Sequence, residues 1–247
     1  MDLSKTLTIY GRKPVLEALQ DNRLSPSRLH LADSNKPGGI VGQIEELAKT
    51  RAVDVQVHAR QALSRISKNG KQDQGVALDL FCREFDSLDN FIDAGAHSSN
   101  DFKAVLLDGV TNPQNVGMII RSCCAAGINA IFYPKRSVAA LGPLVIKGSA
   151  GTLFNAPIIQ CEDAHLTAQS LRERGFDIAV LDSHAETSLF EFTPAKPTVY
   201  VLGGETAGVN TVIKNAASVS LRIPMNNNVE SLNVAVTAAL VAFYGTS

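Results

Sequence analysis

The first 82 residues carry two different hydrophobic periods. Apolar side chains recur every three or four residues in some segments, which predicts amphipathic helices, and alternate with polar ones in others, which predicts strands. Together these segments predict a compact α/β unit that ends near residue 82. The predicted helices are 11–20 and 38–51, and the predicted strands are 28–33, 53–58 and 75–81.

The stretch 84–101 is acidic and polar, and it ends in a cluster of Ser, Asn and Asp residues. Such a composition is typical of a connection outside a core. It predicts a short helix followed by a linker. The expected organisation is therefore a first domain at 1–83, a linker at 84–101 and a second domain at 102–247.

From residue 102 onward, short apolar runs alternate with helical stretches. Continuous apolar runs are typical of strands buried on both faces, and strands that alternate with helices predict a parallel sheet covered on both sides. The expected fold class is α/β in both domains. In the second domain the predicted strands are 102–110, 130–134, 176–182, 198–204 and 219–224, and the predicted helices are 117–127, 165–175 and the C-terminal tail.

Composition narrows the class of protein without indicating an activity. The chain is 45% hydrophobic and 19% charged, and no window reaches the ~18 consecutive apolar residues of a membrane helix. Its start has no apolar signal-peptide region, so we expect a cytoplasmic protein without a membrane partner. The net charge is −1, yet residues 1–75 hold 12 Lys and Arg against 8 Asp and Glu. This asymmetry favours a first domain that faces a polyanion.

The cysteine and histidine positions argue against a metal site and against a thiol nucleophile. The four cysteines lie in apolar surroundings without a CxxC pair, which predicts buried free thiols, and the five histidines show no ligand spacing. The cysteines are Cys82, Cys123, Cys124 and Cys161.

Polar loops follow three predicted strands of the second domain, at the edge where parallel α/β sheets bind ligands. In the first loop, Asn112-Pro113 predicts a turn, and Asn115 and Arg121 follow along the next helix. A purely structural interpretation, in which Asn115 caps the helix and Arg121 makes a surface ion pair, explains this motif alone equally well.

The second loop is GGETAGV, which begins at Gly203. It lacks the glycine spacing of a dinucleotide fingerprint and the Lys-Ser/Thr pair of a phosphate-binding loop. Its glycines predict a close approach of the backbone to a ligand, and Glu205 is suited either to that site or to capping the next helix.

The third loop is IPMNNNVESLN, which covers residues 223–233. Ser231 and Asn233 are two residues apart and would face different ways in a regular helix, so a shared site requires irregular backbone there. Three polar loops at the ends of strands in one domain predict a single cleft.

Taken together, the three loops resemble the motifs of the SpoU (TrmH-type) RNA ribose 2′-O-methyltransferases of the SPOUT superfamily. The matching stretches are 106–127, 201–209 and 223–240. The front segment, with YGRKPVLEAL and QGVALDL, is similar to the L30e-like RNA-binding domain of the RlmB-like branch. The resemblance covers nearly the whole chain.

This resemblance implies a fold, a cofactor and partners. The second domain would be an α/β-knot (SPOUT) methyltransferase domain with a deep trefoil knot near the C-terminus, and the protein would be a homodimer. S-adenosylmethionine would be held bent within the knot. The residues implied to bind it are Leu202, Gly203, Gly204, Ile223, Met225, Ser231 and Leu232.

The resemblance also implies roles in methyl transfer to a ribose 2′-hydroxyl. Arg121 would lie beside the substrate phosphate and the hydroxyl, where it would relay the proton or stabilise the developing alkoxide. Asn115 would orient the arginine or the ribose, and Glu205 would organise its loop and hold Arg121. Ser231 and Asn233 would shape the site, and no metal ion is implied.

The implied substrate is RNA, with a guanosine of large-subunit (23S) ribosomal RNA as the first expectation and transfer RNA as the alternative. For the basic residues of the first domain, solvated surface charge is an equally good interpretation. The residues implied to contact RNA are Arg12, Lys13, Arg28, Arg121, Lys147 and Ser149.

Two positions depart from the family pattern. Asn227 stands where members usually carry glycine, and asparagine tolerates a left-handed backbone better than most residues. Asp73 stands where the first domain often carries histidine, so the RNA contact implied at that position stays open. Two other functions stay open at this point: a nicotinamide-dependent oxidoreductase and a non-catalytic RNA-binding or ribosome-assembly protein.

Overall fold

The computed structural model describes residues 6–81, 85–95 and 101–245, and the chain divides into two compact units. The first unit comprises residues 1–84 together with 142–147, and the second comprises residues 85–141 and 148–247. Each unit has its own sheet, so each is described by itself.

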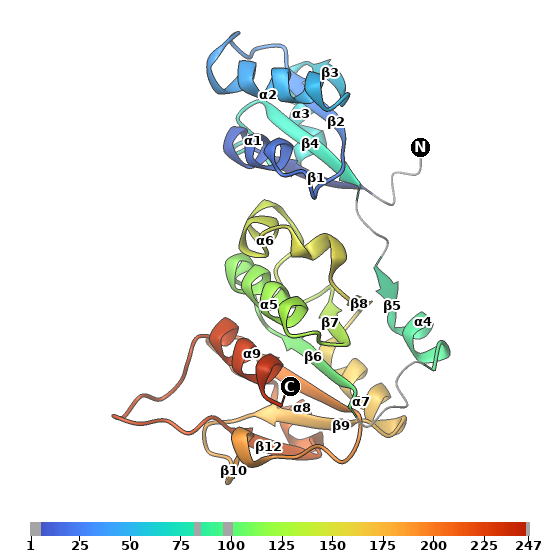
Figure 1. The fold of residues 1–247 in the computed structure, drawn as a ribbon, viewed down its shortest axis with the longest axis vertical. Coiled ribbons are helices and arrows are strands. Elements are labelled where there is room, and N and C mark those ends of the chain that lie inside the picture. The colour runs from blue at the N-terminus through green and yellow to red at the C-terminus, as the bar shows by residue number, and fades with distance from the viewer. Residues whose placement is uncertain (1–5, 82–84, 96–100, 246–247) are drawn as a thin grey trace. The chain divides into compact units, whose positions relative to one another are not determined.

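The first unit is built on a four-stranded mixed sheet in the order β1-β4-β2-β3 (Figure 1). β1 and β2 run antiparallel to β4, and β3 runs parallel to β2. The strands are β1 (Thr6–Tyr10), β2 (Pro26–Ala32), β3 (Asp54–His58) and β4 (Val76–Phe81), and the helices are α1 (Arg12–Gln20), α2 (Gly39–Thr50) and α3 (Arg60–Ser67).

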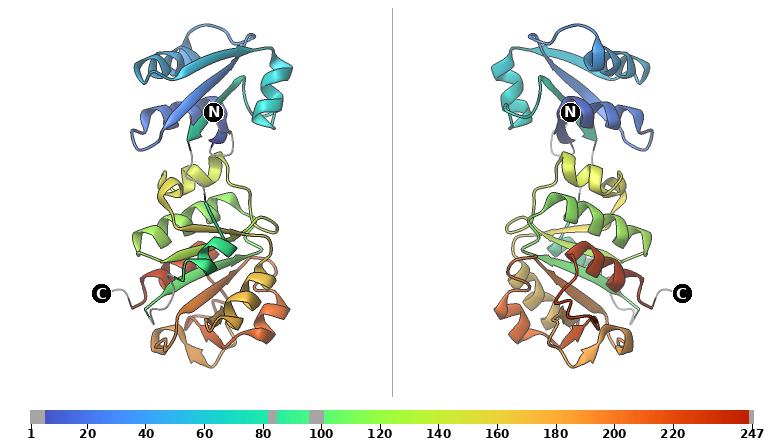
Figure 2. Two further views of the ribbon diagram at one scale, coloured as in Figure 1. Left: turned by 90° about the vertical axis from the view of Figure 1, so that its right-hand side faces the viewer. Right: turned by 90° about the vertical axis from the view of Figure 1, so that its left-hand side faces the viewer.

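Both faces of this sheet are covered. α1 packs against α2 and β4, whereas Leu63 of α3 packs with Ala32 and Ala77 on the opposite face (Figure 2). This double burial explains why β4, VALDLF, is buried at five consecutive positions rather than at alternating ones, including the charged Asp79. The elements predicted for this unit are confirmed to within two residues. β1 and α3 were not predicted, because the sequence of α3, RQALSRIS, has too few apolar residues for a clear helical stripe.

The second unit contains an eight-stranded sheet in the order β10-β12-β9-β11-β6-β7-β8-β5, and every pair in it is parallel. The predicted parallel sheet is confirmed. The strands are β5 (Asp86–Ser87), β6 (Lys103–Asp108), β7 (Ala130–Pro134), β8 (Ile158–Cys161), β9 (Asp177–Leu181), β10 (Thr187–Ser188), β11 (Thr198–Gly203) and β12 (Val219–Arg222).

Helices cover both faces of the larger sheet, as predicted. α5 and α9 pack against each other on one face, while α7 and α8 lie on the other (Figures 1 and 2). No helix in the described part of the chain is long and apolar enough to span a membrane. The helices and 3₁₀ turns of the second unit are α4 (Leu88–Asp93), α5 (Pro113–Ala125), η2 (Thr152–Asn155), α7 (Ala164–Glu173), η3 (Leu189–Glu191), α8 (Thr211–Ala216) and α9 (Val234–Phe243). The helix α6 (Pro143–Gly148) belongs to the first unit except for its last residue.

The expected linker at 84–101 is in part an element of the second unit. β5 pairs with β8 at the edge of the sheet, and Phe91 of α4 stacks against Phe102 and Phe132 at centroid distances of 5.8 and 5.2 Å. The acidic composition of this stretch predicted a linker, but two of its apolar residues, Leu88 and Phe91, pack against the core.

Lys103, at the start of β6, fastens the C-terminal end of α9. Its Nζ donates hydrogen bonds to the carbonyls of Val241 at 3.2 Å and Ala242 at 3.4 Å, and also to the carbonyl of Tyr244. A cation at a helix C-terminus is stabilising because it complements the helix dipole. Burial lowers the pKa of Lys103.

The cysteines of the second unit are free thiols, as predicted. Cys123 and Cys161 are buried, and Cys124 is half-buried. Burial raises the pKa of Cys123 to about 12 and that of Cys161 to about 11, so neither is a thiolate at neutral pH. Cys82 lies outside the described residues.

Candidate active site

The ends of β6 and β11 bring the first two polar loops side by side. Gly203 pairs with Asp108 in the parallel ladder, and the Gly204 N–H donates to the Asp108 carbonyl at 2.7 Å. A Cβ atom on Gly204 would lie only 2.1 Å from the carbonyl oxygen of Gly109, and one on Gly203 would lie 2.2 Å from the backbone of Gly208. These glycines are therefore required for backbone-to-backbone packing, which is a more specific reason than approach to a ligand.

The helix that follows β6 is capped by Asn112 and not by Asn115. Asn112 Oδ1 accepts from the Gln114 N–H at 2.9 Å, and Pro113 occupies the first helical turn, where its missing N–H costs nothing. The capping explanation for Asn115 is therefore wrong. Asn115 is 3% exposed and its side chain points into the unit.

Asn115, Glu205 and Asn233 form one hydrogen-bonded cluster, although they come from three separate segments: the first turn of α5, the loop after β11 and the N-cap of α9. Asn115 Nδ2 donates to Glu205 Oε1 at 2.5 Å, and Asn233 Nδ2 donates to the same oxygen at 2.9 Å. Asn233 Nδ2 also lies 3.2 Å from Asn115 Oδ1. Asn233 Oδ1 accepts from the Ala235 N–H at 2.9 Å and so caps α9. One asparagine side chain thus both begins the last helix and reaches the cluster.

A pocket of about 520 Å³ lies beside this cluster. Backbone and side chains from the ends of β9, β11 and β12 and from the loop before α9 line it. The residues implied above to bind the cofactor all lie in its wall: Leu202, Gly203, Gly204, Ile223, Met225, Ser231 and Leu232. Glu205 and Asn233 line it as well.

A second, smaller pocket of about 190 Å³ shares Glu205 with the first. The loop from Gly109 to Asn112 forms one side, Thr206 and Ala207 form the other, and Asn115 lies in its wall. The hydrogen-bonded cluster therefore stands at the junction of two cavities, one large and one small. Among the described residues, no group of three or more His, Cys, Asp or Glu side chains could hold a metal ion.

The end of β9 supplies a wall of the larger pocket that was not predicted. Asp182 accepts from the His184 N–H at 3.0 Å and from Lys214 Nζ at 2.9 Å. These hydrogen bonds lower the pKa of Asp182 to about 2, so its carboxylate is ionised at all physiological pH values. The missed signal was a polar segment, Asp182-Ser183-His184, directly after an apolar strand.

Arg121 stands apart from the cluster. It lies six residues after Asn115, which places it about 120° away around α5. Its side chain is exposed, it lines neither pocket, and within the described residues its guanidinium has neither an ion pair nor a hydrogen bond. The surface ion pair of the structural interpretation is therefore not seen, and this chain alone does not bring Arg121 to Glu205.

The residues implied to contact RNA differ in their surroundings. Arg12 is held by the Gln74 carbonyl and by Asn35, and Arg28 Nε pairs with Asp54 at 2.9 Å. Lys13 and Lys147 are exposed. Ser149 is the exception, because it is fully buried and its Oγ accepts from the Leu153 N–H at 3.4 Å. The expected RNA contact at Ser149 stays a prediction, and in this chain by itself the side chain is inaccessible and serves its own loop.

Asn227 adopts the backbone conformation that its position suggested. Its φ is 56°, and that of the next residue, Asn228, is 57°. Both are in the left-handed region, where asparagine is the best tolerated residue after glycine. The loop before α9 thus keeps its irregular path without the glycine.

Comparison with known proteins decides the family. Residues 103–243, more than half of the chain, match the model of the SpoU rRNA methylase family. The chain belongs to this family. In this SpoU methylase, residues 8–84 also match a second family model, described as RNA 2′-O ribose methyltransferase substrate binding. The resemblance inferred from the three loops and from the front segment is confirmed.

Individual relatives are distant but cover nearly the full length. YacO of Bacillus subtilis, named for the TrmH family of tRNA/rRNA methyltransferases, is 28% identical over 235 residues, or 95% of this chain and 93% of its own. The SpoU methyltransferase AviRb from Streptomyces viridochromogenes, solved with AdoMet, is 23% identical, with a TM-score of 0.64 over 98% of this chain and 89% of its own. An rRNA methyltransferase from Sinorhizobium meliloti gives a TM-score of 0.61 at 22% identity, over 98% and 87%. These structures establish the fold.

Proposed function

We propose that the protein transfers the methyl group of S-adenosylmethionine to a ribose 2′-hydroxyl of RNA. The observation that carries this proposal is the Asn115–Glu205–Asn233 cluster at the junction of two pockets. We assign the larger pocket to the cofactor and the smaller one, which shares Glu205 with it, to the substrate. Family membership and the AdoMet-bound neighbour support the choice of cofactor.

S-adenosylmethionine, when bound, supplies a methyl group on a sulfonium, which is electrophilic without a metal ion. Methyl transfer would join the substrate 2′-oxygen to the methyl carbon while the electron pair of the broken carbon–sulfur bond returns to sulfur, and the hydroxyl proton would pass to solvent, directly or by way of Arg121. Glu205 and the two asparagine amides fix the geometry at the junction, since a small misplacement of reacting atoms is costly. Ser231 contributes a hydroxyl to the same wall.

Arg121 is proposed to act on the substrate's side of the reaction. Its guanidinium stays charged at neutral pH, so it would stabilise the developing alkoxide and bind the adjacent phosphate, or relay the proton. Because its exposed side chain has no partner in the described part of this chain, it is available to a substrate or to a second subunit.

We also propose that the protein is a homodimer in the cytoplasm, with the trefoil knot of the SPOUT fold in its C-terminal segment. Three exposed apolar residues on the packed pair α5 and α9 support an interface there: Met118, Val236 and Phe243, which are 42, 48 and 50% exposed. Arg121 is on the same side of α5 as Met118, three residues along, so such an interface would bring it near the partner subunit.

The proposed substrate is ribosomal RNA, with a guanosine of the large subunit as the first target and transfer RNA as the alternative. The separate first unit, matched by the substrate-binding family model, favours a large folded RNA. The decisive experiment measures transfer of labelled methyl from S-adenosylmethionine to protein-free 23S RNA and to bulk transfer RNA, followed by mapping of 2′-O-methyl sites. Arg121→Ala should reduce transfer by at least about 100-fold. Near-normal transfer by that variant would remove Arg121 from the mechanism, and no transfer by the native protein to any RNA would support a non-catalytic role.

A further inference from the structure

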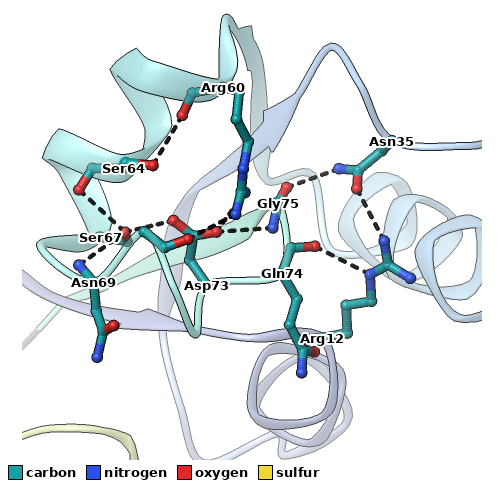
Figure 3. Close-up of polar contacts among 10 residues, drawn as sticks. Arg12, Asn35, Arg60, Ser64, Ser67, Asn69, Asp73, Gln74 and Gly75 are labelled. Carbon is teal, nitrogen blue, oxygen red and sulfur yellow. Dashed lines mark hydrogen bonds and ion pairs between the residues drawn. The ribbon is translucent and has the colours of Figure 1, made fainter.

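The loop between α3 and β4 encloses a fully buried carboxylate. Asp73 is 0% exposed, and it accepts from the Gly75 N–H at 2.9 Å and from Ser67 Oγ at 2.8 Å (Figure 3). Burial alone would raise the pKa of Asp73, but these bonds and a nearby arginine lower it below its ordinary value. A buried charge of this kind requires a fixed partner.

That partner is Arg60, whose side chain lies at the surface. Its Nη1 donates to Asp73 Oδ1 at 2.5 Å and its Nη2 donates to the Gly70 carbonyl at 2.8 Å. The Arg60 side chain is 41% exposed while that of Asp73 is inaccessible. A guanidinium has five N–H donors, so these two bonds fix its orientation and leave other donors for a ligand.

The charge that this segment presents to solvent is entirely positive. Residues 60–75 contain four basic side chains and a single acidic one, which is the buried Asp73. The basic residues are Arg60, Arg65, Lys68 and Lys71, and none of them is buried. The one negative charge in the segment therefore acts on Arg60 from inside and does not repel a polyanion outside.

A second arginine is fixed to the other side of the same loop (Figure 3). Arg12 Nε donates to the Gln74 carbonyl at 3.1 Å, and its Nη2 donates to Asn35 Oδ1 at 3.3 Å. Asn35 Nδ2 in turn donates to the Gly75 carbonyl at 2.7 Å. The loop thus holds two guanidinium groups through its own backbone.

Two residues of the loop other than glycine have a left-handed backbone. Lys68 and Gln74 have φ values of 54° and 52°, which are unusual for residues other than glycine and persist only when the surroundings impose them. Gly75 has a φ of 79°, a backbone conformation that favours glycine, and a Cβ there would displace the Asn35 side chain, whose Oδ1 would lie 2.6 Å away.

From this arrangement we infer that Arg60 binds RNA phosphate together with Arg12, and that Asp73 is the residue that positions Arg60. The inference rests on RNA being the substrate, as proposed above. Guanidinium groups match phosphate oxygens in paired hydrogen bonds, and groups already held in place lose little entropy on binding. Asp73, at the position where histidine is common, thus serves RNA binding indirectly, through the arginine that it orients.

The test compares two arginine variants of the full-length protein that lose the same charge. Arg60→Gln is expected to weaken binding to 23S RNA about fivefold and to lower the slope of log K against log salt by about 1. Arg23→Gln is the control, because Arg23 belongs to the same unit, is 65% exposed and pairs only locally with Asp21 at 2.7 Å. It should leave both quantities within about twofold of the native values. Equal effects of the two variants would overturn the role of Arg60.

The positioning role of Asp73 is tested by a double-mutant cycle. Asp73→Asn should weaken RNA binding in the native background but not in the Arg60→Gln background, because its effect passes through the arginine. Additive losses would mean that Asp73 acts only on the loop's structure. Should Asp73→Asn fail to fold, Arg60→Lys decides between the two roles. If Arg60 contacts phosphate through its planar, forked guanidinium, the lysine variant should bind RNA more weakly, whereas if only its charge matters, RNA binding should not change.

These outcomes are separable from failure of the proposed reaction. The affinity for S-adenosylmethionine, measured by calorimetry, should be unchanged in every variant, since the proposed cofactor pocket lies in the second unit. Absence of methyl transfer together with weakened RNA binding by Arg60→Gln would refute the reaction and keep the inference. Methyl transfer by the native protein, together with equal RNA binding by the Arg60 and Arg23 variants, would support the reaction and refute the inference.

Discussion

Asn233 and Glu205 are joined by a hydrogen bond of 2.9 Å, and the same glutamate oxygen accepts a second one from the buried amide of Asn115. One carboxylate oxygen therefore connects three separate segments of the chain: α5, the loop after β11 and the start of α9. These hydrogen bonds give Glu205 a structural role in its glycine-rich loop.

Two replacements of Glu205 should separate its role as a hydrogen-bond acceptor, which glutamine keeps, from its negative charge, which both variants lose. In Glu205→Gln the amide oxygen can still accept both hydrogen bonds, so stability should change by less than about 0.5 kcal/mol. Glu205→Ala leaves the buried Asn115 amide without its partner and should cost about 1–2 kcal/mol in urea unfolding. Both variants should lose methyl transfer at saturating cofactor. Equal stability of the two would show that Asn115 finds another partner.

Gly204 should be intolerant of any side chain. The Cβ of Gly204→Ala would meet the Gly109 carbonyl at 2.1 Å, and backbone cannot yield as a flexible side chain can. We expect a loss of more than about 3 kcal/mol or failure to fold, measured by chemical unfolding and calorimetric binding of the cofactor. Gly42→Ala, in the helix α2 with nothing within 4 Å of the added atom, is the control and should be stabilising by about 0.5–1 kcal/mol. Similar effects at the two positions would contradict the close packing.

Asn227 should tolerate glycine better than alanine. At φ 56° an alanine pays the steric cost of the left-handed region, about 1 kcal/mol, whereas Asn227→Gly should be neutral within about 0.5 kcal/mol. Asn226→Ala is the matched control, because the neighbouring asparagine does not have a positive φ. Thermal unfolding and the dissociation constant for S-adenosylmethionine report on stability and on the pocket. A neutral Asn227→Ala would mean that the loop has no fixed conformation.

Asp182 should make the second unit sensitive to acid. Its folded pKa of about 2 lies below its ordinary value of 3.8, so the folded state holds fewer protons in that range. The stability it contributes is therefore fully present above about pH 4 and is lost as the pH falls toward 2. Asp182→Asn should be less stable than the native protein at about pH 6, and the difference should shrink at about pH 3. The free energy of unfolding of both proteins is measured by urea unfolding at each pH. A stability difference that does not change with pH would assign the effect to the shape of the side chain rather than to its charge.

The sequence predicted most of the second unit because its buried strands are long apolar runs. It failed where an element is short or polar: β8 has four residues, α3 has few apolar positions, and the anchors Leu88 and Phe91 are surrounded by acids. Such elements are held by tertiary contacts that a local pattern does not contain.

The candidate site, too, could be predicted from the sequence only in part. The loops were found because each comes directly after a predicted strand, and their glycines and amides are visible in the sequence. Which asparagine caps α5 depended on a difference of three residues, and pattern alone could not separate Asn112 from Asn115. The burial of Ser149 is a property of packing that no spacing rule predicts, whereas the six-residue spacing between Asn115 and Arg121 already places them on different sides of a helix.

The separation along the chain of the residues that meet at Glu205 has a consequence for folding kinetics. Asn115 lies 90 positions from Glu205 and 118 from Asn233, and Lys103 reaches α9 across 138. Loops of this length must close before any of these contacts can form, so the pocket should be among the last parts of the unit to assemble. Cofactor binding during refolding would then be a late, all-or-none signal, and a fragment that lacks either end of the second unit should give none.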